Sequence, residues 1–271
     1  MKEKPVIGIL GCGWLGLPLA KELLRLGYRV KGTTTRKSKI NKLRDIGISA
    51  HVVKLTEDSI IGEVDEFLQD INCLIIDVPP GLRKNPNNSF VSKLRLLIPM
   101  LKQAHLKRIF FVSSISVFLD TSPPSSYTET SIPNATSRNG LELIRAEELL
   151  LGQTAFDTKI IRFGGLIGPD RHPIHFLAGR KDLLNGQAPV NLIQQQDCIR
   201  LLIACLEKQV EAQIFHGVFP SHPSKEQYYN AKAKELRLTS PRFSSSAVSA
   251  GKYVSSEETR RILEIDFLQQ P

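Results

Sequence analysis

Short apolar runs alternate with amphipathic stretches along the first two thirds of the chain. The runs "PVIGIL", "YRVKGTTT", "ISAHVVKL", "NCLIIDVPP", "RIFFVSS" and "KIIRFGGLIG" have the length of strands, and turn residues flank most of them. Between them, "PLAKELLRLG" and "FVSKLRLLIPMLKQA" carry apolar residues at helical spacing. Strands that alternate with helices predict a parallel sheet with helices on both faces. We therefore expect an α/β protein with a Rossmann-type doubly wound parallel sheet.

The regular alternation ends near Pro169, which suggests a division of the chain. We assign residues 1–168 to a nucleotide-binding Rossmann domain and residues 169–271 to a small C-terminal substrate lobe. Within the second part, residues 186–208 are expected to return to the Rossmann sheet. Downstream, "SHPSKEQYY" places a serine three residues before a glutamine, and this capping-box spacing predicts the start of a helix.

The formal charge of +9 raises the question of nucleic-acid binding, because clustered Lys and Arg neutralise phosphates. The basic residues are spread thinly, however. Their densest group is Arg36 to Lys39, and no ladder of aromatic residues accompanies it. The charge therefore favours a solvated basic surface or attraction of an anionic small ligand, and we expect no nucleic-acid partner.

Two further features bear on location. No span approaches the roughly 20 apolar residues of a membrane helix, and the stretch after Met1 to Pro5 lacks a signal-peptide pattern. The four cysteines lie far apart in apolar surroundings, so neither a disulfide framework nor a metal site is indicated. We expect a cytoplasmic protein without a metal ion or a membrane partner.

A glycine-rich turn is the strongest local signal. Gly11, Gly13 and Gly16 form G-x-G-x-x-G directly after a predicted strand and at the opening of a predicted helix. In this context the first glycine permits a tight turn and the second lets the backbone approach a pyrophosphate. The third lets the helix pack closely on the strand, and the helix N-terminus attracts the phosphates. A dinucleotide site is expected, and a structural turn without a ligand is the alternative.

The end of the second predicted strand bears on the choice of dinucleotide. Sites that prefer NAD place an acidic residue about twenty positions after the turn, where this chain has "GTTTRKSK". The hydroxyls of Thr34 and Thr35 and the guanidinium of Arg36 suit a 2′-phosphate, so NADP is favoured over NAD. The alternative is that Arg36 lies in solvent and leaves the choice open. The residues expected to line the cofactor site are Gly11, Gly13, Trp14, Leu15, Gly16, Thr34, Thr35, Arg36, Val78, Pro79 and Pro80.

Several motifs together give the chain a family resemblance. The glycine turn, "SSISVF", "RFGGLIGP" and "VNLIQQQDCIRLLIACLE" occur in an order that resembles the extended or atypical short-chain dehydrogenase/reductase superfamily, of the NAD-dependent epimerase/dehydratase type. This resemblance implies hydride exchange with a bound nicotinamide by an oxidoreductase or epimerase. Its substrate would be sugar-nucleotide-like or a carbonyl compound. It also implies a homodimer formed through two helices, here about residues 90–103 and 140–151.

The same resemblance raises a difficulty at the catalytic positions. Family members use a Ser or Thr at the end of the fifth strand, a Tyr about 25 residues later and a Lys four residues further on. Matching "SSISVF" to this pattern places the hydroxyl at Ser114, the Tyr position at Asn139 and the Lys position at Leu143. An amide is no proton donor near neutral pH, so the usual acid–base pair is missing. Asn139 with Glu142 also fits a helix N-cap, and Leu143 fits a buried stripe.

A replacement acid is available in the segment 120–138, which is rich in Pro, Ser and Thr and is expected to be a long, lid-like loop. Tyr127, with Glu129 nearby, can fold back over the nicotinamide in such a loop; an ordinary surface tyrosine is the alternative. The catalytic candidates are Ser114, Tyr127 and Asn139.

The segment "GPDRHPIHFLAGR" supplies candidates for the substrate side. Its cationic residues can grip an anionic group such as a carboxylate or diphosphate, and solvated loop positions are the alternative. These candidates are Arg171, His172, His175 and Arg180. Because the Tyr and Lys are missing, a second function also stays open, a non-catalytic NADP(H)-binding sensor or scaffold.

Overall fold

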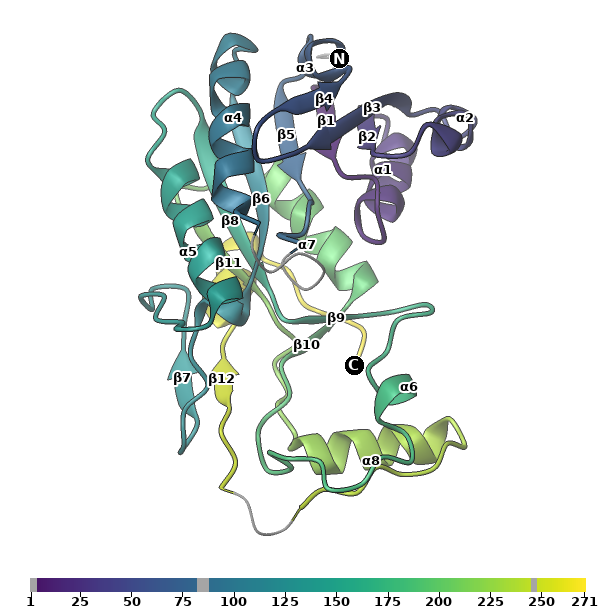
Figure 1. Cartoon of the computed structure of the whole chain (residues 1–271), viewed down its shortest axis with the longest axis vertical. Helices are drawn as coiled ribbons and strands as arrows, with labels where there is room; N and C mark the ends of the chain where they lie inside the picture. The colour runs from purple at the N-terminus through teal and green to yellow at the C-terminus, as the bar shows by residue number, and fades with distance from the viewer. Residues whose placement is uncertain (1–3, 82–87, 245–247) are drawn as a thin grey trace. The chain divides into compact units, whose positions relative to one another are not determined.

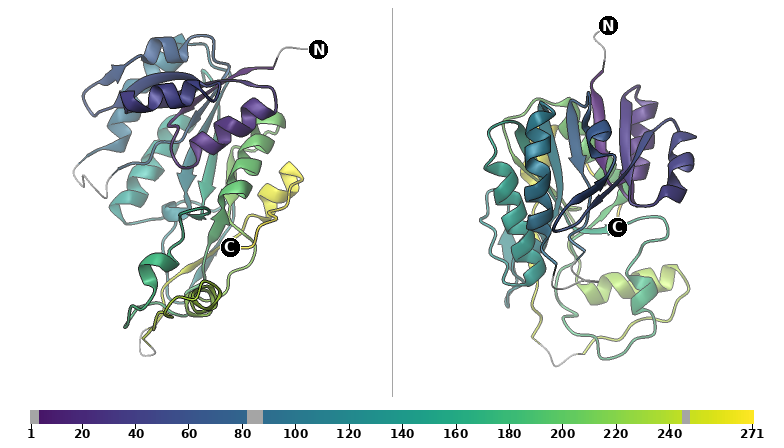
Figure 2. Two further views of the ribbon diagram at one scale, coloured as in Figure 1. Left: turned by 90° about the vertical axis from the view of Figure 1, so that its right-hand side faces the viewer. Right: turned by 45° about the horizontal axis from the view of Figure 1, so that its top comes forward.

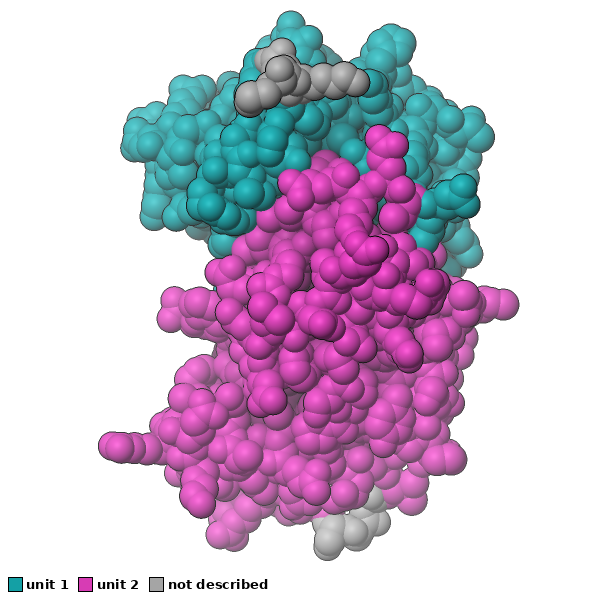
Figure 3. Space-filling model, turned by 180° about the vertical axis from the view of Figure 1, so that it is seen from behind, with its two compact units in different colours: residues 1–114, 137–161, 211–213 teal, residues 115–136, 162–210, 214–271 magenta. Residues whose placement is uncertain are grey.

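The computed structural model of the chain describes residues 4–81, 88–244 and 248–271. Residues 1–3, which belong to the stretch considered above for a signal peptide, lie outside this range. The chain forms two compact units that take alternating parts of the sequence (Figure 3). The first comprises residues 1–114, 137–161 and 211–213, and the second comprises residues 115–136, 162–210 and 214–271.

An eight-stranded sheet has the order β11-β8-β6-β5-β1-β2-β3-β4. The pairs β1–β2, β2–β3, β1–β5 and β5–β6 are parallel, and the edge strand β4 is antiparallel to β3. After β1 the chain moves toward one edge through β2 and β3, and it later returns to the other side of β1 through β5 and β6. This reversal is the switch point of a doubly wound sheet, and it confirms the predicted α/β class. The strands are β1 Val6–Leu10, β2 Arg29–Thr34, β3 Ser49–Leu55, β4 Ile60–Gly62, β5 Cys73–Ile76, β6 Arg108–Ser114, β8 Asp157–Phe163 and β11 Ile214–Gly217.

Helices cover both faces of the sheet in the first unit. Helices α4 and α5 lie side by side on one face, and α1 lies on the opposite face (Figures 1 and 2). The side chain of Ser89 caps α4 by accepting from Ser92 N, and that of Ser137 caps α5 by accepting from Gly140 N. The helical segments are α1 Gly16–Arg25, η1 Lys37–Lys39, α2 Ile40–Arg44, α3 Val64–Leu68, α4 Phe90–Gln103 and α5 Arg138–Leu151.

The second unit is less regular, as the sequence indicates. Two parallel two-stranded sheets, β9–β10 and β7–β12, accompany its helices. The predicted capping box is present, because Ser224 accepts from Gln227 N while the Gln227 side chain accepts from Ser224 N. The elements are η2 Ile115–Val117, β7 Ser125–Tyr127, β9 Gly165–Ile167, α6 Ile174–Leu177, β10 Leu192–Gln194, α7 Gln195–Glu207, α8 Lys225–Glu235, β12 Lys252–Val254 and α9 Glu257–Leu263.

The end of the chain is attached to the start of α7. Asp197 is fully buried in the first turn of this helix, where its carboxylate accepts hydrogen bonds from Leu268 N at 3.1 Å and Gln269 N at 3.0 Å. Arg200 donates to the carbonyl of Asp266 at 3.0 Å. The backbone of the C-terminal segment is therefore held by side chains of one helix.

The segment 120–138 is largely irregular, as expected, but it contains one short strand. Strand β7 lies within it and pairs in parallel with β12, so that Ser125 is opposite Lys252 and Tyr127 is opposite Val254. A further bridge joins Thr121 to Gly251. Pairing with a strand more than a hundred residues away fixes the middle of this segment.

None of the helices in the described part of the chain has the length and apolar character that a membrane crossing requires.

Candidate functional site

The glycine turn between β1 and α1 has the geometry of a phosphate-binding loop. Gly11 has φ +112°, and a Cβ there would overlap the carbonyl oxygen of Asp77. A Cβ at Gly16 would overlap the carbonyl of Gly11, so helix and turn pack without room for a side chain. At Gly13, by contrast, no non-neighbouring heavy atom among the described residues lies within 4 Å of a Cβ position. Gly13 is thus the open point of the turn, where a ligand can approach the backbone.

The positive end of α1 lies beside this open point. The N-cap residue Leu15 makes no side-chain capping bond, and the first turn carries no acidic residue. Anions are favoured at such a helix end by the aligned peptide dipoles and by the N–H groups of its first turn. Leu15 is buried and Trp14 half-buried. The arrangement suits the pyrophosphate of a dinucleotide.

Thr33 also holds the turn, a role that the glycine motif alone does not predict. Its hydroxyl accepts from Gly11 N at 2.9 Å, and its carbonyl accepts from Cys12 N at 2.8 Å. The side chain is 2% exposed, so Thr33 is an internal support for the turn. The run of three threonines was the available signal, but only the pairing of β1 with β2 shows which of them faces the turn.

The residues predicted to determine the choice between NAD and NADP lie at the end of β2. Thr34 is buried, and its hydroxyl accepts from Arg36 N at 3.2 Å, whereas Thr35 and Arg36 are exposed. Lys37 and Lys39 follow in η1, which gives three cations within four residues. Burial raises the pKa of Cys12 to about 12, while the positive charge of Lys39 acts in the opposite direction. The end of β2 is therefore followed by an exposed Thr35 and three exposed cations.

The segment after β5 forms the neighbouring side of the turn. Val78 packs against it, since its Cγ1 lies 3.2 Å from a Cβ position at Gly11. Val78 and Pro80 are half-buried, and Pro79 is exposed. Because β5 is the parallel neighbour of β1, these predicted cofactor residues and the turn lie at the same carboxyl edge of the sheet.

Ser114 is the last residue of β6 and is half-buried. Strand β6 is the parallel neighbour of β5, so Ser114 ends at the carboxyl edge that carries the glycine turn. The preceding residue has a different role, because the hydroxyl of Ser113 donates to the buried carboxylate of Glu147 at 2.5 Å. Of the two serines, Ser113 supports α5 and Ser114 is the one at the strand tip.

Asn139, which the sequence resemblance matches to the Tyr position, is exposed in the first turn of α5. The proposed pairing of Asn139 with Glu142 as an N-cap is wrong, because Ser137 is the N-cap and Glu142 serves another helix. Glu142 is buried and accepts from Phe90 N at 2.7 Å and from Val91 N at 3.1 Å, at the start of α4. The predicted buried stripe is present, since Leu143, Ala146 and Leu150 are all buried.

Tyr127 lies in the second unit as a buried residue. Its hydroxyl donates to the carbonyl of Leu119 at 3.0 Å and accepts from Asn134 Nδ2 at 3.2 Å. Its ring stacks on Phe118 with centroids 4.5 Å apart. The phenolic proton is therefore already engaged within the unit. The alternative of a surface tyrosine does not hold either, because the residue is 7% exposed.

Glu129 and His216 form a buried polar group near Phe118. The carboxylate of Glu129 accepts from both the backbone and the hydroxyl of Thr259, and this hydroxyl in turn accepts from His216 N. The Nδ1 of His216 bonds the carbonyl of Ser255 at 2.9 Å, which makes Nδ1 the protonated nitrogen of a neutral ring. Burial lowers the pKa of His216 from 6.5 to about 4.

This pKa predicts acid sensitivity of the fold. Between pH 6.5 and 4 the unfolded chain binds a proton at His216 that the folded chain does not, so stability falls as the pH falls through this window. The loss is about 3 kcal/mol by pH 4. Urea unfolding of the wild type and of His216→Gln between pH 7 and pH 4.5 measures it. The variant is expected to show a flatter pH dependence, and an equal slope for both proteins would refute the assignment.

The substrate-side candidates of the second unit differ in exposure. Arg171, His175 and Arg180 are exposed. His172, in contrast, is not available as a cation that could bind an anionic substrate group. Its Nδ1 accepts from Ile174 N at 3.1 Å, so the ring is neutral and its Nε2–H donates to the hydroxyl oxygen of Tyr228 at 2.8 Å. Burial, together with the charge of Lys232, lowers the pKa of His172 to about 4.

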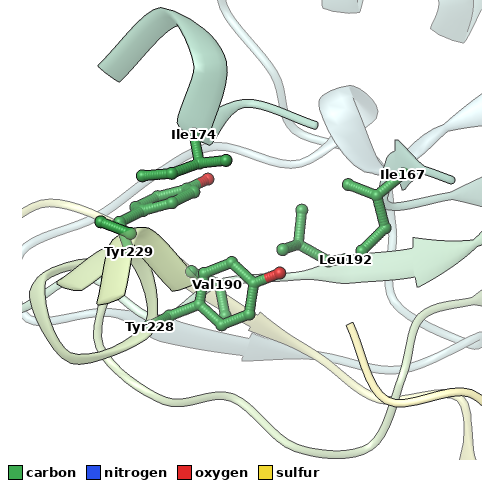
Figure 4. Packing of buried hydrophobic residues seen from close by; sticks show 7 residues of the cluster. Ile167, Ile174, Val190, Leu192, Tyr228 and Tyr229 are labelled. Atoms are coloured by element: carbon green, nitrogen blue, oxygen red, sulfur yellow. The ribbon is translucent and has the colours of Figure 1, made fainter. Parts of the chain in front are cut away.

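Tyr228 belongs to an apolar cluster of buried residues in the second unit. Figure 4 shows Tyr228 and Tyr229 of α8 projecting among apolar residues of α6 and of the β9–β10 region, Val190 among them. His172 is thus attached to the packed core of the lobe. The cluster consists of Ile167, Ile174, Val190, Leu192, Tyr228, Tyr229 and Ala233.

Comparison with known proteins identifies the family of this chain. No family model matches it. Protein YeeZ of Escherichia coli strain K12 is 30% identical over 266 residues, which cover 97% of this chain and 95% of YeeZ. This chain belongs to the YeeZ family. The alignment spans both units, so the family assignment covers the glycine turn as well as the C-terminal lobe.

Solved structures show the same fold at lower identity. UDP-glucuronic acid 4-epimerase of Bacillus cereus, in complex with NAD, is 17% identical with a TM-score of 0.78, over 98% of this chain and 94% of the enzyme. A short-chain dehydrogenase/reductase superfamily protein of Agrobacterium tumefaciens with bound NAD is also 17% identical, with a TM-score of 0.77 over 98% and 93% of the two chains. The predicted resemblance to this superfamily is therefore confirmed at the level of the fold.

Proposed function

We propose that this chain binds a nicotinamide dinucleotide at the glycine turn and acts with it as an oxidoreductase or epimerase on a sugar-nucleotide-like or carbonyl substrate. The observation that carries this proposal is the open position at Gly13 beside the uncapped start of α1. The two solved structures described above hold NAD and have the same fold. In this proposal the turn holds the pyrophosphate, and the nicotinamide lies toward the carboxyl edge where β6 ends.

NADP is the preferred dinucleotide in this proposal, because three cations follow β2 and no acidic residue occupies that place. Arg36→Glu is expected to weaken NADPH binding at least about thirtyfold, since it replaces a charge-assisted bond with repulsion of the 2′-phosphate. NADH affinity should change less than about threefold. Calorimetric titration of both cofactors measures the difference, and Lys21→Glu on the exposed side of α1 is the control of equal charge change. An equal loss of affinity for NADPH and NADH would show that Arg36 does not determine the preference for NADP.

Ser114 supplies the hydroxyl that bonds the substrate oxygen in the catalytic form of the proposal. Ser114→Ala is expected to lower kcat about tenfold to a hundredfold and to leave NADPH affinity unchanged, because this hydroxyl contacts the reacting group and not the pyrophosphate. Cofactor absorbance, followed with a panel of UDP-sugars and aldehydes, reports the turnover. A wild-type protein that binds NADPH but turns over no member of the panel would contradict the enzymatic proposal.

The second candidate function is a non-catalytic NADP(H)-binding sensor or scaffold. One prediction from the sequence and one observation support it. The sequence match places Asn139 and Leu143 at the positions of the superfamily's Tyr and Lys, and the hydroxyl of Tyr127 donates to the carbonyl of Leu119. It predicts tight cofactor binding without turnover and a partner whose affinity changes with the cofactor. A homodimer through α4 and α5 and a cytoplasmic location complete the proposal; sizing in solution tests the first and fractionation the second.

A further inference from the structure

The outward side of α8 forms one wall of a groove of about 850 Å³ in the C-terminal lobe. Tyr228, Tyr229 and Ala233 bury the inner side of this helix in the apolar cluster. Residues at the spacing i, i+4 and i+8 lie on a different side and line the groove, namely Glu226, Asn230 and Lys234. Helix α8 is labelled in Figure 1, where α6 lies beside it.

The opposite wall is the segment that follows α8, and the backbone holds it in place. Arg242 N donates to the carbonyl of Arg180 at 2.9 Å, and Leu183 N donates to the carbonyl of Arg242 at 3.1 Å. Phe243 packs over Gly186, where a Cβ would lie 2.9 Å from the Cβ of Phe243. These contacts fix the wall, so the groove is formed before any ligand arrives.

The charges of the groove are unbalanced. Lys234 and Arg242 line it, and neither forms a salt bridge or a side-chain hydrogen bond with any part of the chain that the structure describes. The carboxylate of Glu226, the acidic residue of the lining, accepts from Gln187 Nε2 at 3.2 Å. Unpaired cations on a concave surface attract anions, and a guanidinium suits the geometry of a phosphate group.

The groove also has an apolar side, which places a second requirement on the chemistry of its ligand. The half-buried Leu238 and Phe243 line it next to the cations, and Pro241 lies buried among the lining residues. A volume of about 850 Å³ lies in the range of small-molecule sites, which combine an apolar wall with a few charged groups. An ion such as sulfate would leave this wall exposed to water, whereas a ligand with a ring would cover it.

We propose that this groove binds a phosphorylated small molecule with a flat ring, with the phosphate on Lys234 and Arg242 and the ring against the half-buried Phe243 and Leu238. The site shares no residue with the glycine turn, so it is a second anion site and does not depend on the dinucleotide proposal. A nucleoside monophosphate has the required chemistry, and uridine 5′-monophosphate is the probe.

The test is calorimetric titration of the full chain with uridine 5′-monophosphate and, separately, with inorganic phosphate. Saturable binding of the nucleotide is expected, weakened at least about tenfold by Arg242→Glu and by Lys234→Glu. Lys181→Glu, an exposed lysine outside the groove, is the matched charge control and should change the affinity less than about twofold. Phe243→Leu should weaken the nucleotide and leave inorganic phosphate unchanged.

Three results would overturn the proposal. The first is absence of saturable nucleotide binding at millimolar concentration. The second is an equal loss with Lys181→Glu, which would indicate only general attraction by a basic lobe. The third is loss of nucleotide binding in Gly13→Glu, which would place the probe at the glycine turn instead. Far-UV circular dichroism of each variant verifies that the fold is kept.

Discussion

Gly13→Glu is expected to reduce NADPH affinity at least about a thousandfold while leaving the protein folded. The reason is the open surroundings of this position, since a Cβ at Gly13 has no non-neighbouring heavy atom of the described residues within 4 Å. A carboxylate there projects into the space where the pyrophosphate is proposed to lie, so it adds steric exclusion and repulsion between anions. A thousandfold loss corresponds to about 4 kcal/mol.

Two matched variants separate binding from stability at the turn. Gly13→Ala should lower the affinity less than the glutamate does, because it adds bulk without charge. Gly16→Val should lower the melting temperature instead, since any side chain there overlaps the carbonyl of Gly11. Calorimetry and thermal unfolding of all three proteins measure both effects. If Gly13→Glu binds NADPH like the wild type, the turn is only structural and the dinucleotide proposal fails.

Glu142→Ala is expected to destabilise the protein by about 4 kcal/mol. It removes the acceptor for the buried N–H groups of Phe90 and Val91, and each unsatisfied buried donor costs about 1–3 kcal/mol. The first turn of α4 also loses the negative charge that stabilises its N-terminus. Urea unfolding measures the change in free energy.

The control for this residue is Glu142→Gln, which keeps an oxygen acceptor at the same place and should cost clearly less than the alanine. Glu148→Ala, on an exposed position of the same helix, should change the stability by less than about 0.5 kcal/mol. An effect of Glu142→Ala no larger than that of Glu148→Ala would contradict the role of Glu142 at α4.

The parts of the fold that the sequence predicted well are those in which neighbouring residues decide the structure. The glycine turn, the capping box at Ser224 and the stripe of Leu143 each depend on a spacing of a few residues. Apolar runs indicated the buried strands for the same reason, because the whole run is covered in a parallel sheet. The resemblance to the short-chain dehydrogenase/reductase superfamily, too, was visible in motifs that are short in sequence.

The parts that the sequence did not predict depend on contacts between distant residues. Thr33 supports the turn because β2 pairs with β1, and Glu142 serves α4, whose first residue is 52 positions away. The segment around Tyr127 is ordered by a strand near Val254. Likewise the pKa of His172 is lowered because folding buries the ring, which bonds the hydroxyl of Tyr228. None of these contacts produces a recognisable pattern among residues that are close in the sequence.

The carboxylate of Asp197 binds the C-terminal segment through the main-chain amides of Leu268 and Gln269. This affects which substitutions the segment tolerates. Amide donors are common to all residue types except proline, so the exposed side chains at positions 268 and 269 are free to vary as long as neither becomes proline. Removal of these two positions has a larger effect. A chain that stopped before residue 268 would leave a carboxylate inside the protein without these donors, which folding tolerates poorly.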